Sequence, residues 1–235
     1  MKRTIRTAVI ATLLGAAALG FAGAATAAPL DDPKGLCANH DAAGNCLFAY
    51  SGPSHNVDVT FPAGDPQEQA IIDYVNTTID DFESGAGPLG TLDTPLPLEE
   101  LDVTGTRYTS GHTQSVVVET YQMMRGAAHP ATWYKSFTWD NAAHTPVGFD
   151  GLFRPGTEPL AVILPIVAQQ MSAEAGQPLT IDPAVGLDPA NYRNFAITDD
   201  AVTFFFDRDQ MHPAYGATQV SVPRNAIADL LTPGL

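Results

Sequence analysis

Residues 56–85 read NVDVTFPAGDPQEQAIIDYVNTTIDDFESG, which is the pattern of a strand followed directly by a helix. Val57, Val59 and Phe61 alternate with polar residues, and this period of two is typical of a half-buried strand. The spacing of apolar residues changes to a helical period after residue 65. This stretch therefore predicts one strand and one helix in direct succession.

The helix carries clear signals at both of its ends. Asp65 suits the N-cap, Pro66 the first helical position, and Glu68 the third position of a capping box. Gly85 suits the C-terminal end. The apolar residues between them fall on one stripe, which we expect to be buried: Ile71, Ile72, Val75, Ile79 and Phe82.

Strand patterns dominate the chain beyond a Gly- and Pro-rich loop at residues 84–97. A second helix is expected at 158–175, where Pro165 either kinks it or begins it. A hairpin is expected around Asp199 and Asp200, and a short helix near the end. Short turns between strands imply antiparallel pairing, so we expect an α+β fold with a mostly antiparallel sheet and helices packed on one side. The expected strands are 57–61, 101–109, 115–124, 132–139, 194–198, 201–206 and 218–222, and the last helix is 225–231.

The N-terminus has the pattern of a secretory signal peptide. Lys2, Arg3 and Arg6 precede an uncharged apolar run, and Ala25-Thr26-Ala27 gives an A-x-A cleavage site. The alternative, an uncleaved anchor, is disfavoured because the run is short and rich in Ala and Gly, and no later stretch approaches the roughly 20 apolar residues of a membrane span. We therefore expect residues 1–27 to be removed and the protein to be secreted or held at the cell envelope.

Two cysteines, Cys37 and Cys46, flank a segment rich in turn-forming residues. A disulfide between them is favoured in an oxidising compartment, whereas a redox motif needs C-x-x-C and a zinc site needs more ligands. Residues 28–56 are then expected to form a disulfide-linked N-terminal extension, followed by a single α+β domain at 57–235.

The charge balance argues against one class of partner. The 235 residues contain 11 Lys and Arg against 26 Asp and Glu, for a net charge of -15. Loss of Lys2, Arg3 and Arg6 with the signal peptide, which contains no acidic residue, makes this -18. Nucleic-acid binding needs clustered basic residues, so it is disfavoured, whereas a basic protein partner fits the charge.

The chain lacks the usual local motifs of enzymes and metal sites. It contains no G-x-S-x-G, H-E-x-x-H or nucleotide-binding glycine motif, so no catalytic residue is assigned and no metal or cofactor is expected. Ser54-His55 and Ser110-Gly111-His112 place serine near histidine in sequence, which is no evidence for a triad because catalytic partners are usually distant in sequence. A triad assembled in space stays open.

Aromatic residues on the strand at 132–139 are candidates for binding, because aromatic faces contribute strongly to contacts. Alternation places Trp133 and Trp139 on one face and Tyr134 on the other. The competing interpretation is that these residues belong to the core, and that His129 is a turn residue bonded to the backbone. The full set of binding candidates is His129, Trp133, Tyr134, Trp139, Asp140 and Tyr215.

Several motifs resemble one extracellular domain of unknown function, and in aggregate the likeness covers roughly residues 35–231. The motifs are GAAHP at 126–130, YKSFTWD at 134–140, FDGLF at 149–153, DPANYRNFAIT at 188–198, FFF at 204–206, YG at 215–216 and VSVP at 220–223. On these motifs the chain resembles the secreted mycobacterial immunogenic protein family, related to the C-terminal domain of RsiV-type anti-sigma factors.

The resemblance implies an exported α+β protein with a β-grasp-like portion, and a host-recognised antigen if the source is a pathogen. RsiV-type relatives bind lysozyme, a basic enzyme, which agrees with the negative charge of this chain. Some mycobacterial relatives are regarded as esterases. Two hypotheses follow: a secreted non-catalytic protein that binds a basic protein or an envelope glycan, or a small secreted esterase for short acyl esters.

Overall fold

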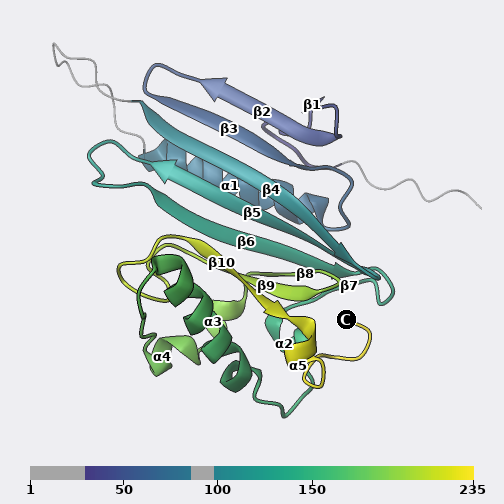
Figure 1. Ribbon diagram of the computed structural model, residues 1–235. Coiled ribbons are helices and arrows are strands. Elements are labelled where there is room, and N and C mark those ends of the chain that lie inside the picture. The colour runs from purple at the N-terminus through teal and green to yellow at the C-terminus, as the bar shows by residue number, and fades with distance from the viewer. Residues whose placement is uncertain (1–29, 86–97) are drawn as a thin grey trace, which may run out of the picture. The chain divides into compact units, whose positions relative to one another are not determined.

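Two β-sheets, each with helices on one face, make up the unit Asp31–Leu235 (Figure 1). The computed structural model describes residues 30–85 and 98–235. The expected signal peptide at 1–27 and most of the expected loop at 84–97 lie outside the described residues. The α+β class and the mostly antiparallel pairing are confirmed.

The larger sheet has seven strands in chain order. The strands are β1 (Asn39–His40), β2 (Asn45–Ser51), β3 (His55–Pro62), β4 (Glu99–Ser110), β5 (Thr113–Met123), β6 (Ala131–Asp140) and β7 (Thr145–Pro146). Neighbouring strands pair antiparallel except β3 and β4, which run parallel because α1 (Glu68–Gly85) crosses between them. The β2–β3 hairpin, the crossing helix and the parallel pair form the expected β-grasp-like portion.

Helix α1 begins as its sequence predicts. Asp65 Oδ1 accepts the backbone N–H of Gln67 at 2.9 Å, as an N-cap does. Glu68 differs from the expected capping box, because its Oε2 accepts the N–H of Gly64 at 3.0 Å. The predicted apolar stripe is buried and packs against the large sheet at Leu101, Val103, Val116, Val118 and Phe137.

The expected N-terminal extension contributes two strands to the large sheet. Strand β2 pairs with β3 along its whole length, from Asn45↔Pro62 to Ser51↔Asn56. The disulfide between Cys37 and Cys46 is confirmed, and Cys46 is fully buried. The turn-forming residues around this segment give no local sign of a strand, because β2 is stabilised by its pairing with β3.

The smaller sheet has three antiparallel strands in the order β10-β9-β8. The expected hairpin is confirmed as β8 (Phe195–Ile197) and β9 (Ala201–Phe206), with β10 (Thr218–Pro223) beside β9. Helix α3 (Pro159–Ala175) passes through Pro165 and ends at Gly176, whose φ of 67° suits a glycine C-cap. Because there are two sheets, the helices do not share one side of a single sheet: α1 packs on the large sheet and α3 on the small one.

Polar side chains cover the free edge of β6 where the two sheets meet. Asn194 Nδ2 donates to Tyr134 O at 2.8 Å, and the N–H of Ser136 donates to Asn194 Oδ1 at 3.2 Å. The N–H of Tyr134 donates to Asp207 Oδ1 at 2.7 Å. These contacts satisfy backbone groups that an open sheet edge would expose.

Short helices complete the unit. They are α2 (Phe149–Leu152), α4 (Pro183–Gly186), the 3-10 helix η1 (Pro189–Tyr192) and α5 (Arg224–Ile227), which is shorter than the expected helix at 225–231. Within residues 30–85 and 98–235, no helix combines the length and the hydropathy needed to cross a membrane.

Candidate functional site

The face of the large sheet opposite α1 carries a group of exposed carboxylates. Alternation along β3, β4 and β5 turns Val57, Val59, Leu101 and Val103 toward α1 and leaves the intervening polar residues on the other face. We call the exposed carboxylates of this surface the acidic face: Asp58, Glu100, Asp102 and Glu119.

Two members of the acidic face lie directly opposite each other. The parallel pairing of β3 and β4 aligns Asp58 with Asp102, and both are exposed. Burial, followed by the charges of Asp58 and Glu100, raises the pKa of Asp102 above its usual value. Like charges placed opposite each other destabilise a sheet, so this arrangement costs folding free energy.

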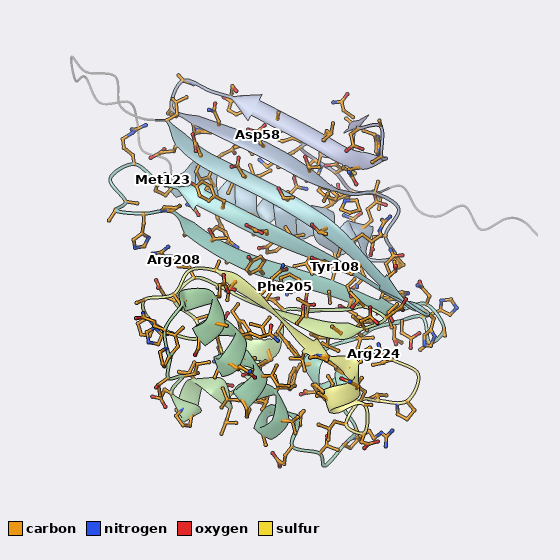
Figure 2. The ribbon with its side chains drawn as sticks, viewed as in Figure 1. Asp58, Tyr108, Met123, Phe205, Arg208 and Arg224 are labelled. Atoms are coloured by element: carbon orange, nitrogen blue, oxygen red, sulfur yellow. A yellow bond between two sulfur atoms is a disulfide. The ribbon has the colours of Figure 1, made fainter. Side chains whose placement is uncertain are left out.

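Tyrosines border the acidic face where the small sheet packs on it. The rings of Tyr108 and Tyr134 contact Phe205 with centroids 5.9 and 5.3 Å apart, and Figure 2 shows Tyr108 beside Phe205 and Asp58 on the more distant β3. Burial and then the charge of Glu119 raise the pKa of Tyr134 to about 12, so its hydroxyl stays protonated. The acidic face thus ends at a contact between aromatic rings.

The two tryptophans predicted as a platform lie on the α1 side of β6. Strand register aligns Trp133 with Thr120 and Trp139 with Gln114. Trp133 is half-buried, and its Nε1 donates to Tyr74 Oη of α1 at 2.9 Å. Trp133 is thus held by a side chain of α1, and neither tryptophan belongs to a core cluster of the described residues.

The other predicted binding residues lie apart from one another. His129 is exposed, and its Nδ1 lies 3.1 Å from the carbonyl oxygen of Pro130. Asp140 accepts backbone N–H groups of the following turn, which lower its pKa, and lies 3.7 Å from His112 Nε2. Tyr215 donates to the Met171 carbonyl, and burial followed by Glu174 raises its pKa to about 12. The six candidates therefore do not form one site.

One serine–histidine contact stands at the start of β3. Ser54 Oγ lies 3.1 Å from His55 Nδ1, and strand register aligns His55 with the buried Glu99. Glu99 Oε1 accepts the N–H of Arg125 at 3.3 Å, and Arg125 Nη2 donates to Ser54 O at 3.4 Å. No other serine–histidine side-chain bond occurs among the described residues, so a nucleophilic serine beside a base is found here alone in that part of the chain.

Sequence reasoning did not single out the acidic face. Its signal was present, because acidic and apolar residues alternate around Asp58 and Asp102. What the alternation cannot reveal is that these two strands pair in parallel and align the two carboxylates.

One family model and several known proteins match this chain. Residues 150–225 match a family model described as "Protein of unknown function (DUF3298)". The chain is 42% identical to Esterase Rv3036c of Mycobacterium tuberculosis over 79% of this chain and 82% of the relative. It is 39% identical to the immunogenic proteins MPT64 of Mycobacterium tuberculosis and MPB64 of Mycobacterium bovis, over 89% of this chain and 92% of each relative.

Solved structures show the same fold at low identity. A DUF3298 family protein of Pseudomonas aeruginosa has a TM-score of 0.51 and 17% identity, covering 82% of this chain and 96% of that one. A DUF3298 member from Bacteroides fragilis has a TM-score of 0.51 and 12% identity, covering 80% and 92%. The sequence matches show more than the fold: this chain belongs to the family of the mycobacterial immunogenic proteins MPT64 and MPB64.

Proposed function

We propose that this is a secreted, non-catalytic binding protein whose acidic face engages a basic protein. The observation that carries the proposal is the exposed, directly opposed pair Asp58 and Asp102. A surface that brings like charges together costs stability, and a cationic partner removes that cost on binding. Export rests on the signal peptide expected at residues 1–27.

The surroundings of this pair support a cationic partner. None of the residues that strands β2 to β5 turn away from α1 is lysine or arginine, so no basic side chain on these strands neutralises the acidic face. The exposed Arg107 of β4 lies on the α1 side, where its Nη2 donates to the Ala63 carbonyl. The net charge of -15, which becomes -18 without residues 1–27, attracts a cationic partner over a longer range. Lysozyme, the partner that the family resemblance suggests, has the required charge.

A glycan partner has less support. A sugar platform needs an exposed aromatic face, whereas Trp133 is half-buried and bonded to Tyr74, and Trp139 is half-buried on the same side of the sheet. On the acidic face, the aromatic residue beside Asp102 in strand register is Tyr121, and it is half-buried. Charge is therefore the dominant feature of this surface.

Calorimetry with egg-white lysozyme tests the proposal. We expect the double variant Asp58→Asn, Asp102→Asn to bind about tenfold more weakly or worse, with a smaller dependence on salt. The matched control is Asp73→Asn, Asp81→Asn, which removes two exposed charges from α1 on the other side of the sheet. No binding at 20 mM salt, or equal weakening in both double variants, would contradict the proposal.

A second candidate function is ester hydrolysis, favoured by the contact between Ser54 and His55 and by the likeness to a relative named an esterase. In this mechanism His55 Nδ1 accepts the Ser54 proton as Oγ attacks the ester carbonyl, and that proton passes to the departing alcohol. Water then hydrolyses the acyl-serine and releases the acid. Glu99 stands opposite His55 on β4 in strand register, but within the described residues the two side chains make no hydrogen bond or ion pair, and His55 Nε2 is buried without a partner.

Short-chain nitrophenyl esters and a serine-directed phosphonate test this second function. We expect phosphonate-sensitive turnover that Ser54→Ala abolishes and Ser84→Ala, on the exposed end of α1, leaves unchanged. Turnover retained in Ser54→Ala, or no turnover in the unmodified protein, would exclude it.

A further inference from the structure

The basic residues of this acidic chain are nearly all engaged by neighbouring groups. Within residues 30–85 and 98–235 there are eight, and six of them make hydrogen bonds or ion pairs through their side chains: Lys34, Arg107, Arg125, Arg154, Arg208 and Arg224.

The other two cations, Lys135 and Arg193, line one cleft. Both are exposed, and within the described part of the chain their side-chain nitrogens make no hydrogen bond or ion pair. Lys135 Nζ lies 5.8 Å from the centroid of the Phe137 ring, which leaves its donors free. Two uncompensated cations at one place in a strongly anionic protein make a local site for an anion.

The walls of this cleft are partly apolar. Its volume is about 670 Å³, within the range of small-molecule sites, and it lies between the start of α1, strand β6 and the segment before α2. Phe137, Val147 and Phe149 supply apolar surface beside the two cations. An anion that carries an apolar body fits this lining better than a fully hydrated inorganic ion.

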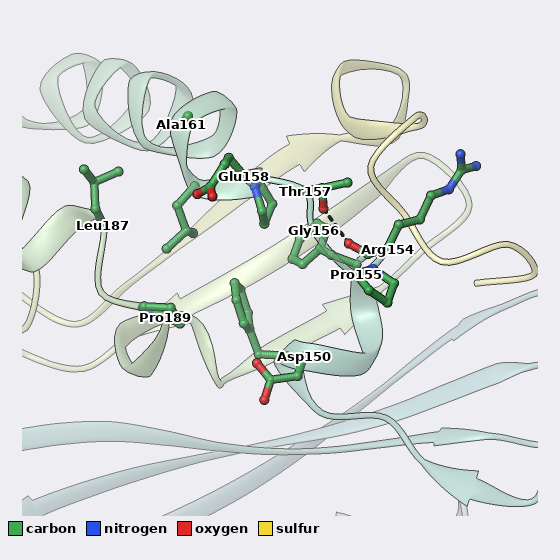
Figure 3. A pocket seen from close by; sticks show the side chains of 13 residues that line it. Asp150, Arg154, Pro155, Gly156, Thr157, Glu158, Ala161, Leu187 and Pro189 are labelled. Carbon is green, nitrogen blue, oxygen red and sulfur yellow. Dashed lines mark hydrogen bonds between the residues drawn. The ribbon is translucent and has the colours of Figure 1, made fainter.

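A second, more apolar cavity adjoins the cleft. Its volume is about 650 Å³, and it shares Phe149, Asp150 and Pro189 with the first. Figure 3 shows Leu187 and Pro189 along one side of it, with Leu187 48% exposed. An exposed leucine beside a concave apolar surface provides room for an aliphatic chain.

Charged side chains around the second cavity do not offer another anion site. Arg154 points away from it in Figure 3, and its Nε donates to the Leu231 carbonyl at 2.9 Å. Asp150, at the junction of the two cavities, and Glu158, beside the second, are both exposed carboxylates. An anionic head group is therefore attracted by Lys135 and Arg193 and repelled by Asp150, which disfavours ions of high charge.

We infer that the cleft binds a single carboxylate attached to an aliphatic chain, a monoanionic amphiphile of the fatty-acid class. Lys135 and Arg193 hold the carboxylate, and the chain extends past Phe149 toward Leu187. This site lies on the α1 side of β6, so it is separate from the acidic face and independent of the proposed function.

Calorimetry of the mature chain with decanoate, below its micelle concentration, tests the site, with decylamine and inorganic phosphate as comparison probes. We expect decanoate to bind more tightly than either, and Lys135→Gln, Arg193→Gln to weaken it about tenfold or more. Asp150→Asn should tighten decanoate binding a few-fold, because it removes a neighbouring like charge. Arg208→Gln, the matched loss of a cation elsewhere, should leave it unchanged.

Three outcomes would overturn the inference. Equal affinity for decanoate and decylamine would mean that apolar contact alone drives binding. Equal decanoate affinity in the double variant and in Arg208→Gln would mean that the two cations do not hold the carboxylate. Binding to phosphatidylglycerol vesicles without binding to soluble decanoate would assign the surface to a membrane.

Discussion

Replacing Asp102 by asparagine should stabilise the fold while weakening a basic partner's binding. The side chain lies opposite Asp58 on the neighbouring strand, and burial, Asp58 and Glu100 together raise its pKa. An acid whose pKa is raised on folding binds protons more tightly in the folded state, so its charge destabilises the protein above that pKa. The substitution removes this cost and keeps nearly the same shape.

The part of the gain that comes from charge repulsion, and that salt screens, follows from Coulomb's law for solvent-exposed charges. Strands about 4.8 Å apart place the two carboxylates about 6 Å apart, which gives about 0.7 kcal/mol in water of low ionic strength. Screening at physiological salt roughly halves this, and Glu100 adds a similar, slightly smaller amount. The expected stabilisation is therefore about 1 kcal/mol at 10 mM salt and about 0.5 kcal/mol at 150 mM salt.

Urea denaturation at both salt concentrations, for Asp102→Asn, Asp58→Asn and the double variant, measures the gain and the coupling between the two sites. The two single gains should add to more than the double gain, because either substitution removes the same repulsion. The advantage of Asp102→Asn should shrink as the pH falls through the raised pKa of Asp102 and vanish below the ordinary pKa of an aspartate, where the carboxyl is neutral in both the folded and the unfolded parent protein. A loss of stability at neutral pH, or a gain indifferent to salt, would refute the reasoning.

Three further predictions concern packing, the disulfide and the sheet edge. Gly105→Ala should destabilise the fold by about 1–3 kcal/mol in urea titration, because the added Cβ would lie 2.6 Å from Phe61 Cβ. Reducing the disulfide between Cys37 and Cys46 should cost about 2–3 kcal/mol, the value for a loop this short, measured by denaturation with and without reductant. Asn194→Ala should cost about 2 kcal/mol and speed amide exchange at the edge of β6, because it leaves two backbone groups unpaired.

Matched controls separate these effects from general damage. Gly216→Ala adds a methyl group where no atom lies within 4 Å and should change stability little, so an equal loss would refute the packing argument. An unchanged denaturation midpoint after reduction would show that the disulfide between Cys37 and Cys46 does not stabilise the fold. Asn194→Asp retains an acceptor for the Ser136 N–H but loses the donor to the Tyr134 carbonyl, so it should also destabilise the fold. An Asn194→Asp variant as stable as the parent protein would refute the argument about the sheet edge.

Local patterns were sufficient wherever one segment carries its own signal. The helix after residue 65 has a cap, a buried stripe and a glycine stop within a single stretch, and the hairpin at Asp199 and Asp200 has strong β-formers on both sides. The two cysteines likewise lie close enough in sequence to pair across turn residues. Strand β2 was missed because its stability comes from pairing with β3, which no local pattern records.

The sequence by itself determined the secondary structure of the strongest segments, the disulfide, the acidic charge and the family. Only the tertiary structure decided that there are two sheets, that Asp58 stands opposite Asp102, and that Lys135 and Arg193 share a cleft although they are far apart in the chain. The physical reason is the distance along the chain over which each kind of interaction acts. Periodicity, capping and turn chemistry act between near neighbours in sequence, whereas strand pairing and the meeting of distant charges depend on how the whole chain packs.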